Sequence, residues 1–228
     1  MKEIQDAKSA IMEEQGIFYE FDEVNIMSGR AMMVGPEETP YEGCLLCFSI
    51  QYPGDYPFSS PLVRIITSDG FTRFHPNLYV DGKVCLSILG TWRGPPWAPV
   101  MTISTVLNTI QSILEANPII NEPGHETLKL AGPDSRARDY AELVQFRLVS
   151  HTFRGLSMWA KGILFPEWKG FEDVLREHGE RLMANLGKVI ARKAEEEDKN
   201  YERVLYSMHG KTEWKHLLNL WKAEKLRD

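Results

Sequence analysis

Residues 74–89 of this 228-residue chain read FHPNLYVDGKVCLSIL, and this stretch decides the fold and the chemistry that we expect. A His-Pro-Asn turn, formed by His75, Pro76 and Asn77, is followed by an Asp-Gly turn and then by Cys85, which begins a short apolar run. A thiol reacts as its thiolate, so a nucleophilic Cys85 must be partly exposed and able to deprotonate. Cys85 is therefore the candidate nucleophile.

The segments on either side of this stretch make it specific. Upstream lie a proline-rich turn, PGDYPFSSP at residues 53–61, and an earlier strand and hairpin at residues 34–43. Downstream lie WAP at residues 97–99 and TISTVL at residues 102–107. Over roughly the first 125 residues, the order and spacing of these segments resemble the ubiquitin-conjugating enzymes, and a collinear series is far more specific than one short motif.

The resemblance implies roles for the residues of the central stretch. Cys85 would carry ubiquitin or a ubiquitin-like modifier as a thioester, and Asn77 would assist transfer of the modifier to an amine. An amide N–H of Asn77 could stabilise the oxyanion of that step, or Asn77 could hold the loop through backbone hydrogen bonds; both roles stay open. His75 is expected to be structural, because Pro76 makes this a rigid turn.

Two further groups of residues follow from the resemblance. Collinear matching places Asn121 and Glu122 where family members position the incoming lysine, although residues 121–124 could equally form a simple turn. Phe58, Pro99 and Val100 match the two loops that family members present to RING or HECT ligases, and an exposed aromatic residue beside prolines is a suitable anchor. The alternative for Phe58 is a buried packing role.

Departures from minimal members of the family point to one branch of it. Residues 90–96 lengthen the loop after the cysteine, residues 68–71 lengthen the approach to His75, and roughly a hundred residues follow the turn at 121–124. These features look most like the Z-type branch, which accepts ubiquitin and the modifier FAT10 from the activating enzyme dedicated to them. The implied partners are a modifier, an activating enzyme, a ligase and protein substrates.

Composition narrows the class of protein. The formal net charge is −6 and the pI is about 5.6, so no basic surface predicts binding to nucleic acid. No segment has the length of a membrane span, and the first residues lack the apolar core of a signal peptide, so we expect a location in the cytoplasm and also the nucleus.

The cysteines agree with a reducing compartment. The chain has three cysteines, and Cys44 and Cys47 form a Cys-Leu-Leu-Cys pair that could be a metal or redox motif. They flank an apolar run that is typical of a buried strand, on which residues three apart point to opposite faces. We therefore expect two buried hydrophobic side chains, and the sequence predicts no metal site and no cofactor.

The pattern of apolar residues predicts an α+β fold. It indicates an opening helix over residues 3–15 and strands over 17–26, 31–34, 45–52 and 62–67, whose short connections favour a four-stranded antiparallel meander. A long helix behind the active site follows from about Thr102, and apolar spacing indicates further helices beyond residue 140. We divide the chain into a core domain, residues 1–155, and a C-terminal helical extension, residues 156–228, which either regulates the core or completes it.

Two other classes of function compete. A cysteine hydrolase is conceivable because Cys, His and Asn are all present, but hydrolases usually draw the nucleophile and the base from separate segments. The second alternative is a catalytically inactive variant that only binds ubiquitin. Retention of Cys85 and Asn77 argues against it, because such variants lack the cysteine.

Overall fold

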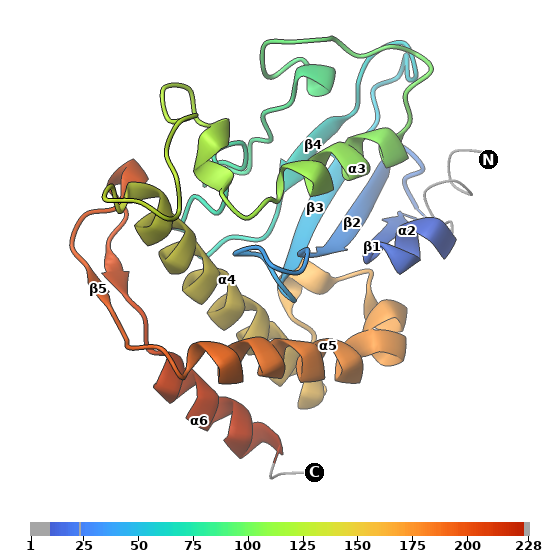
Figure 1. The fold of residues 1–228 in the computed structure, drawn as a ribbon. Coiled ribbons are helices and arrows are strands. Elements are labelled where there is room, and N and C mark those ends of the chain that lie inside the picture. The colour runs from blue at the N-terminus through green and yellow to red at the C-terminus, as the bar shows by residue number, and fades with distance from the viewer. Residues whose placement is uncertain (1–9, 23, 226–228) are drawn as a thin grey trace.

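A four-stranded antiparallel sheet forms the centre of the molecule. The computed structural model describes residues 10–22 and 24–225. The strands follow the order β1 (Ile17–Phe21), β2 (Ser28–Val34), β3 (Leu45–Gln51) and β4 (Leu62–Ile65), each paired with the next along the chain (Figure 1). Two-residue and longer turns suffice to join such neighbours, which is why no helical crossover is needed. The predicted meander is confirmed.

The end of the first helix also follows the prediction. Helix α2 (Ala10–Glu14) stops at Gly16, whose φ of 74° lies in the left-handed region that glycine adopts without strain. Residues 3–9 of the predicted opening helix lie outside the described residues.

The helix that follows the cysteine segment packs through one apolar stripe. Helix α3 (Ile103–Ile113) is preceded by a capping box, in which the side chains of Thr102 and Thr105 bond each other's backbone N–H groups. Its buried residues belong to the same hydrophobic cluster as the sheet, and they are Ile103, Val106, Leu107 and Ile110. The cysteine segment itself contributes a short 3-10 helix, η1 (Ser87–Leu89).

The C-terminal half is mainly helical. Its elements, in chain order, are η2 (Pro118–Asn121), α4 (Arg136–Ala160), η3 (Pro166–Trp168), α5 (Glu172–Lys193), β5 (Asn200–Tyr201), η4 (Leu205–Ser207), β6 (Gly210–Lys211) and α6 (Trp214–Lys225). Helix α5 packs against both α4 and α6, and β5 pairs with β6. The helices were predicted from the apolar spacing, but the small β5–β6 hairpin was not. In the described ranges, none of the helices combines the length and the apolar character needed to cross a membrane.

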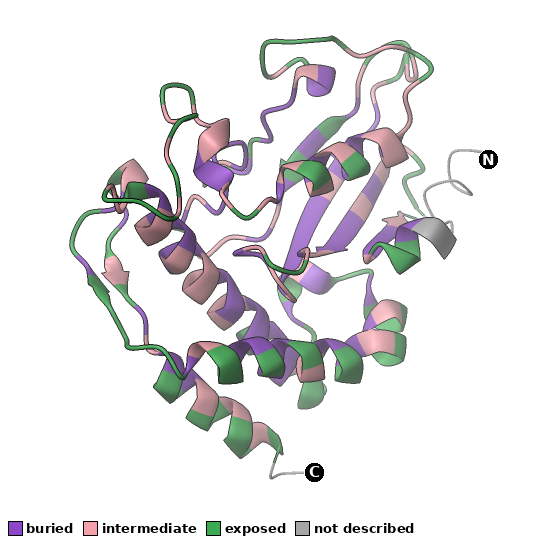
Figure 2. Cartoon of the chain, viewed as in Figure 1, coloured by how far each residue is buried: buried purple, intermediate pink, exposed green. Residues whose placement is uncertain are grey.

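Both faces of the central strand are covered. Residues Leu45 to Phe48 are all buried, although successive side chains of a strand point to opposite faces (Figure 2). The helical half reaches the sheet directly, because Thr152 Oγ1 of α4 accepts a hydrogen bond from the Leu45 N–H at 3.1 Å. The ring of His178 in α5 lies 5.2 Å from the ring of Phe18. The predicted boundary between residues 155 and 156 falls inside α4, which is continuous to Ala160; the division into two domains stays a prediction.

Candidate active site

The structure ties Asn77 and Cys85 together through their backbones and the asparagine side chain. The Cys85 N–H donates to the Asn77 carbonyl oxygen at 2.8 Å. In return, Nδ2 of Asn77 donates to the Cys85 carbonyl oxygen at 2.7 Å. Residues eight positions apart in sequence are thus held side by side, on the two arms of the loop that turns at Asp81 and Gly82.

His75 acts as a hydrogen-bond acceptor inside the turn. Its Nδ1 accepts the Asn77 backbone N–H at 2.9 Å, and the residue is completely buried. Burial lowers the pKa of His75 to about 3, because the imidazolium would lose its hydration; a contact with the backbone of Ile113 acts in the opposite direction. A neutral imidazole of such low basicity suits the structural role that the resemblance implies for His75. Pro76, for which the resemblance implies a structural role too, is also buried.

The Asn77 side chain has capacity left after it binds Cys85. An amide nitrogen carries two hydrogens, and one of them is donated to the Cys85 carbonyl. The other end of the amide, Oδ1, is buried and has no hydrogen-bond partner. The observed bonds are those of a loop-holding residue, and the oxyanion role of Asn77 stays a prediction.

The expectation that Cys85 is partly exposed is wrong. The residue is only 1% exposed. The lengthened loop after it folds back onto the chain: Oγ1 of Thr91 donates to the Val84 carbonyl at 2.7 Å and accepts the Leu86 N–H at 2.9 Å. Both neighbours of Cys85 are therefore tied to Thr91 of this loop.

The two candidate lysine-positioning residues have different surroundings. Asn121 ends η2 and folds back on its own loop, because its Nδ2 donates to Glu115 Oε1 at 2.8 Å and to the Pro118 carbonyl at 3.3 Å. Glu122 points elsewhere and contacts Arg73, whose Nη2 lies 3.7 Å from Glu122 Oε2. Glu122 is thereby joined to the segment that leads into His75, whereas Asn121 is not.

Two residues at this site escaped the sequence analysis. Arg73 lies two positions before His75 and bonds the Pro76 carbonyl through its guanidinium, with Nε at 3.2 Å. Tyr206, far along the chain, donates its hydroxyl to Glu122 Oε2 at 2.5 Å. Arg73 could have been noticed from its proximity to the central stretch, but no sequence signal connects Tyr206 to it.

The candidate ligase-binding residues lie on two loops that are tied together. The indole Nε1 of Trp97 donates to the Pro57 carbonyl at 2.7 Å, which joins the loop of residues 53–61 to that of residues 97–100. Phe58 is 76% exposed and Val100 is 87% exposed, and Pro99 is exposed as well. The alternative interpretation of Phe58, a buried packing role, is therefore excluded.

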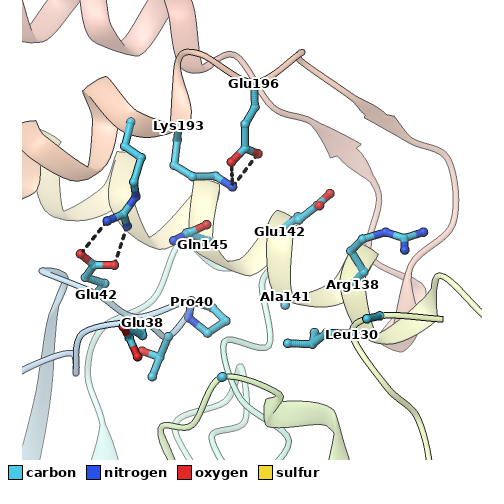
Figure 3. Close-up of a pocket in the computed structure, with 14 residues that line it drawn as sticks. Glu38, Pro40, Glu42, Leu130, Arg138, Ala141, Glu142, Gln145, Lys193 and Glu196 are labelled. Carbon is cyan, nitrogen blue, oxygen red and sulfur yellow. Dashed lines mark hydrogen bonds and ion pairs between the residues drawn. The ribbon is translucent and has the colours of Figure 1, made fainter.

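A separate pocket of ≈ 470 Å³ lies between the hairpin at residues 38–42, α4 and the end of α5 (Figure 3). Four of the charged side chains in its walls pair with one another: Arg192 bonds Glu42 at 2.5 Å, and Lys193 bonds Glu196 at 2.6 Å. It includes none of the predicted site residues.

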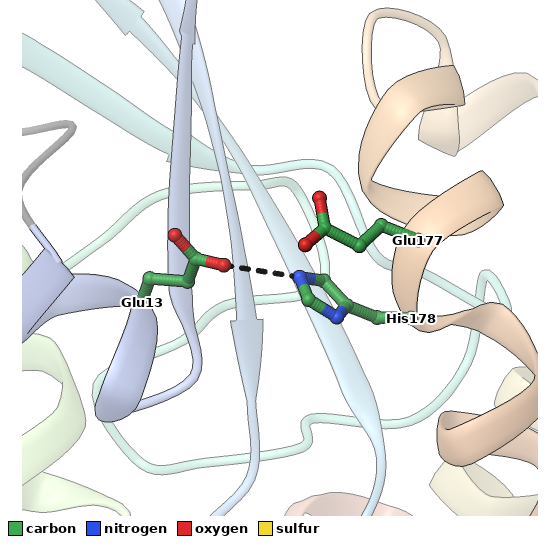
Figure 4. A group of neighbouring side chains, drawn as sticks. All are labelled: Glu13, Glu177 and His178. Carbon is green, nitrogen blue, oxygen red and sulfur yellow. Dashed lines mark hydrogen bonds and ion pairs between the residues drawn. The ribbon is translucent and has the colours of Figure 1, made fainter.

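One group of side chains has the composition of a metal site. Glu13, Glu177 and His178 bring their ligand atoms within 4.8 Å of one another between α2 and α5 (Figure 4). His178 Nε2 and Glu13 Oε1 are 3.2 Å apart and form a hydrogen bond. The two carboxylates are exposed, and exposed acidic groups commonly gather without a metal.

Cys44 and Cys47 are both fully buried, and burial raises the pKa of each thiol.

Comparison with known proteins identifies the fold around this site. The family model described as ubiquitin-conjugating enzyme matches residues 1–145. The ubiquitin-conjugating enzyme E2 Z of Homo sapiens is 43% identical over 135 residues, which cover 59% of this chain and 37% of the human protein. A probable ubiquitin-conjugating enzyme of Caenorhabditis elegans is 36% identical over 167 residues, which cover 71% of this chain and 22% of the other. The chain therefore matches less than half of the length of either relative.

A solved structure gives a weaker likeness. The E2 domain of a Toxoplasma gondii ubiquitin conjugating enzyme is 28% identical, with a TM-score of 0.47, and the match covers 66% of this chain and 94% of that domain. The family match alone extends over more than half of the chain and includes every residue from the first strand to the middle of α4. The chain accordingly belongs to the ubiquitin-conjugating enzyme family, and it is similar to the E2 Z branch.

Proposed function

We propose that this protein accepts activated ubiquitin as a thioester on Cys85 and transfers it to the amine of a lysine or to a ligase. The observation that carries the proposal is the reciprocal bonding of Cys85 and Asn77, which holds a side-chain amide donor beside the cysteine. The other two cysteines are fully buried, and burial raises the pKa of both thiols, which disfavours their reactive thiolate form. Membership of the family supports the same reaction.

The chemistry follows from these groups. The Cys85 thiolate attacks the carbonyl carbon of the activated modifier, the earlier thiolate leaves, and a new thioester forms. When a lysine amine attacks that thioester, the carbonyl oxygen gains negative charge, and the second hydrogen of Asn77 Nδ2 is available to stabilise it. The Cys85 thiolate then leaves and the nitrogen loses a proton, for which an acidic neighbour such as Glu122 is suited because a free lysine has a pKa of about 10.4.

The covered position of Cys85 sets a condition on this reaction. A residue that is 1% exposed cannot receive a protein modifier without a local rearrangement. The hydrogen bonds of Thr91 to Val84 and Leu86 join the lengthened loop to both neighbours of the cysteine. We therefore expect this loop or the Cys85 side chain to move when the activating enzyme delivers the modifier.

A charging assay tests the proposal. The protein is incubated with activating enzyme, ATP and ubiquitin, and the expected product is an adduct that thiol reagents remove. Cys85→Ala should abolish the adduct, and Cys85→Ser should give an ester that resists thiols. Cys44 and Cys47 remain in both variants, so a normal thioester on the Cys85→Ala or the Cys85→Ser protein would refute the assignment to Cys85. Peptide cleavage without ATP would indicate a hydrolase, and binding of ubiquitin without any adduct would indicate an inactive variant.

Asn77→Ala separates the two roles of that residue. If the amide stabilises the oxyanion, the variant charges normally but discharges onto free lysine about 10²- to 10³-fold more slowly. If Asn77 only holds the loop, charging and thermal stability fall together with discharge. Equal discharge rates for the variant and the parent would remove the catalytic role.

The same assay addresses the choice of modifier and partners. The similarity to E2 Z supports ubiquitin as one modifier, and we propose FAT10 as a second, tested by offering both with their activating enzyme. RING or HECT ligases are the proposed partners of the surface formed by Phe58, Pro99 and Val100. A location in the cytoplasm and the nucleus stays a prediction.

A further inference from the structure

The Arg73 guanidinium is held between two aromatic rings. Its central carbon lies 3.7 Å from the centre of the Tyr79 ring and 4.2 Å from the centre of the Tyr206 ring. A planar guanidinium stacks well on such faces, and its edge remains free for hydrogen bonds. That edge is used, because the guanidinium donates to the Pro76 carbonyl in the middle of the His-Pro-Asn turn.

The backbone beside Arg73 is fixed by two buried tyrosines. The hydroxyl of Tyr140 in α4 donates to the Arg73 carbonyl at 2.8 Å, and the hydroxyl of Tyr41 donates to the Phe74 carbonyl at 2.9 Å. Both tyrosines are fully buried. The approach to the turn is thus held at its main chain by two other parts of the fold, and at its side chain by Tyr206.

Tyr206 bonds the neighbouring carboxylate as well as the guanidinium. Its hydroxyl donates to Glu122 Oε2 at 2.5 Å, and the same oxygen lies 3.7 Å from Arg73 Nη2. Burial, followed by the nearby carboxylate, raises the pKa of Tyr206, so the hydroxyl keeps its proton and remains a donor. One side chain therefore fixes both a cation and an anion that flank the proposed site.

The turn that presents Tyr206 has an unfavourable backbone. Tyr206 has a φ of 60° and Ser207 a φ of 58°, and neither is glycine. Residues other than glycine adopt this left-handed conformation only where their surroundings compensate for it. Here the turn is closed by the bond from the Val204 N–H to the Met208 carbonyl at 2.7 Å, and Tyr206 contacts Arg73, Glu122 and the ring of Tyr140.

We propose that Tyr206, in the C-terminal extension, is a positioning residue of the transfer site, where it fixes the Arg73 guanidinium under the Pro76 carbonyl and aims the Glu122 carboxylate. This proposal rests on the proposed function, because that function places the lysine amine beside Glu122. Without the Tyr206 hydroxyl, Glu122 can rotate away from its observed position. Without the ring, Arg73 loses one of its two stacking partners, and the turn that carries Asn77 loses support.

Two variants and a matched control test the proposal. Tyr206→Phe removes only the hydroxyl, and Tyr206→Ala removes the ring too. Tyr201→Phe is the control, because Tyr201 lies in the same extension and likewise donates to a glutamate, Glu142 Oε2 at 2.7 Å, but on α4. Each protein is charged, and discharge is then followed in a single turnover over a range of free lysine concentrations.

The expected results separate positioning from general stability. Tyr206→Phe should raise the half-saturating lysine concentration about 3- to 10-fold with little change in the maximal rate, and Tyr206→Ala should also lower that rate. Tyr206→Phe should charge at the parent rate, because it leaves the stacking on Arg73 and the turn in place, and Tyr201→Phe should match the parent throughout. Parent-like lysine dependence in both Tyr206 variants would overturn the proposal, and so would an equal effect in the Tyr201 control.

A second measurement does not depend on the reaction. Amide hydrogen exchange of the uncharged protein reports on the Asn77 and Cys85 N–H groups, which are both bonded within the site. Tyr206→Ala should speed exchange of these two amides, whereas Tyr201→Phe should not. If the parent fails to charge, the proposed function is refuted and the exchange result still decides whether Tyr206 holds the turn; unchanged exchange would overturn the positioning role.

Discussion

Replacing Gly155 by alanine should destabilise this protein, although the same change in an ordinary helix is stabilising. Gly155 lies inside α4, where the indole of Trp168 packs against its backbone. A Cβ atom at residue 155 would be 2.4 Å from Cη2 and 2.6 Å from Cζ2 of Trp168, and 3.0 Å from Cδ1 of Phe165. Carbon atoms in contact are normally about 3.5–4.0 Å apart, so the indole would have to retreat by more than 1 Å.

The magnitude follows from two opposing contributions. Alanine in a helix interior is favoured over glycine by about 1 kcal/mol. Forcing an extra carbon into a packed core costs about 1–3 kcal/mol, and Trp168 is fully buried, so it cannot swing into solvent. Because the indole is confined, the packing cost falls in the upper part of this range, at about 2–3 kcal/mol. The net loss in the free energy of unfolding is then about 1–2 kcal/mol, which for a chain of this length lowers the melting temperature by roughly 2–8 °C.

A second glycine of the same kind supplies the control. Gly187 in α5 faces Trp221 of α6, and a Cβ atom there would be 2.2 Å from Cζ2 of the indole. Trp221 is only partly buried, so its ring can move outward. Gly187→Ala should therefore change the stability by less than Gly155→Ala, because outward movement of the ring relieves the clash and the helix propensity of alanine offsets the remaining cost.

Denaturant and thermal unfolding followed by circular dichroism measure these effects. Trp168→Phe, which is destabilising itself, should make room at residue 155, so that Gly155→Ala costs less in that background than in the parent. The double-mutant cycle should give a favourable coupling of about 1–2 kcal/mol. A Gly155→Ala variant that is more stable than the parent would refute the packing argument.

Three further predictions concern the extension, the turn and the ligase surface. Deletion of residues 156–228 should give an insoluble or non-cooperatively unfolding product, because it removes the fully buried Trp168 and Leu186 from the core; a soluble, chargeable fragment would show a regulatory extension instead. His75 has a folded pKa of about 3 against an ordinary 6.5, so the unfolded chain binds more protons as the pH falls below 6.5, and stability should fall by up to about 1.4 kcal/mol per pH unit between these values. His75→Asn keeps an acceptor for the Asn77 N–H and should show a flatter acid limb in unfolding experiments; parallel curves would contradict the burial of a neutral imidazole. Phe58→Ala should weaken ligase-stimulated discharge about tenfold or more with charging unchanged, whereas Ile26→Ala, at a similarly exposed apolar residue, should not.

The sequence predicted the elements of the fold better than their ends. The first strand was expected to reach Ile26, but it stops at Phe21 because the Asp22 carboxylate accepts the N–H groups of Val24 and Asn25 and forms a turn. The second strand was expected to begin at residue 31, yet Gly29 already lies in β2 opposite Phe21. A Cβ atom at Gly29 would be 2.0 Å from the Tyr19 hydroxyl oxygen, so this glycine serves a close approach between neighbouring strands. Such a contact depends on which strand pairs with β2, and the local sequence pattern does not specify that pairing.

The candidate site shows the same division between local and distant information. His75, Asn77 and Cys85 are close in sequence, and the structure joins them by hydrogen bonds. The burial of Cys85 was not predicted, and neither were the bonds by which Thr91 ties the following loop to Val84 and Leu86. The contact of Tyr206 with Glu122 spans 84 positions along the chain and depends on the path of the whole extension.

The helical half of the chain is therefore joined to the proposed site through Tyr206 and to the sheet through α4 and α5. Helix α4 begins within the part of the chain that matches the family and continues beyond it. Tyr140, near its start, holds the Arg73 carbonyl, while Thr152, further along, bonds Leu45 of β3. The helical half thus contacts the approach to His75 by two routes, through Tyr140 of α4 and through Tyr206. Point variants at Tyr206 and Gly155 separate these routes: the first releases Glu122 while the core stays intact, and the second loosens the core while Tyr206 keeps its partners.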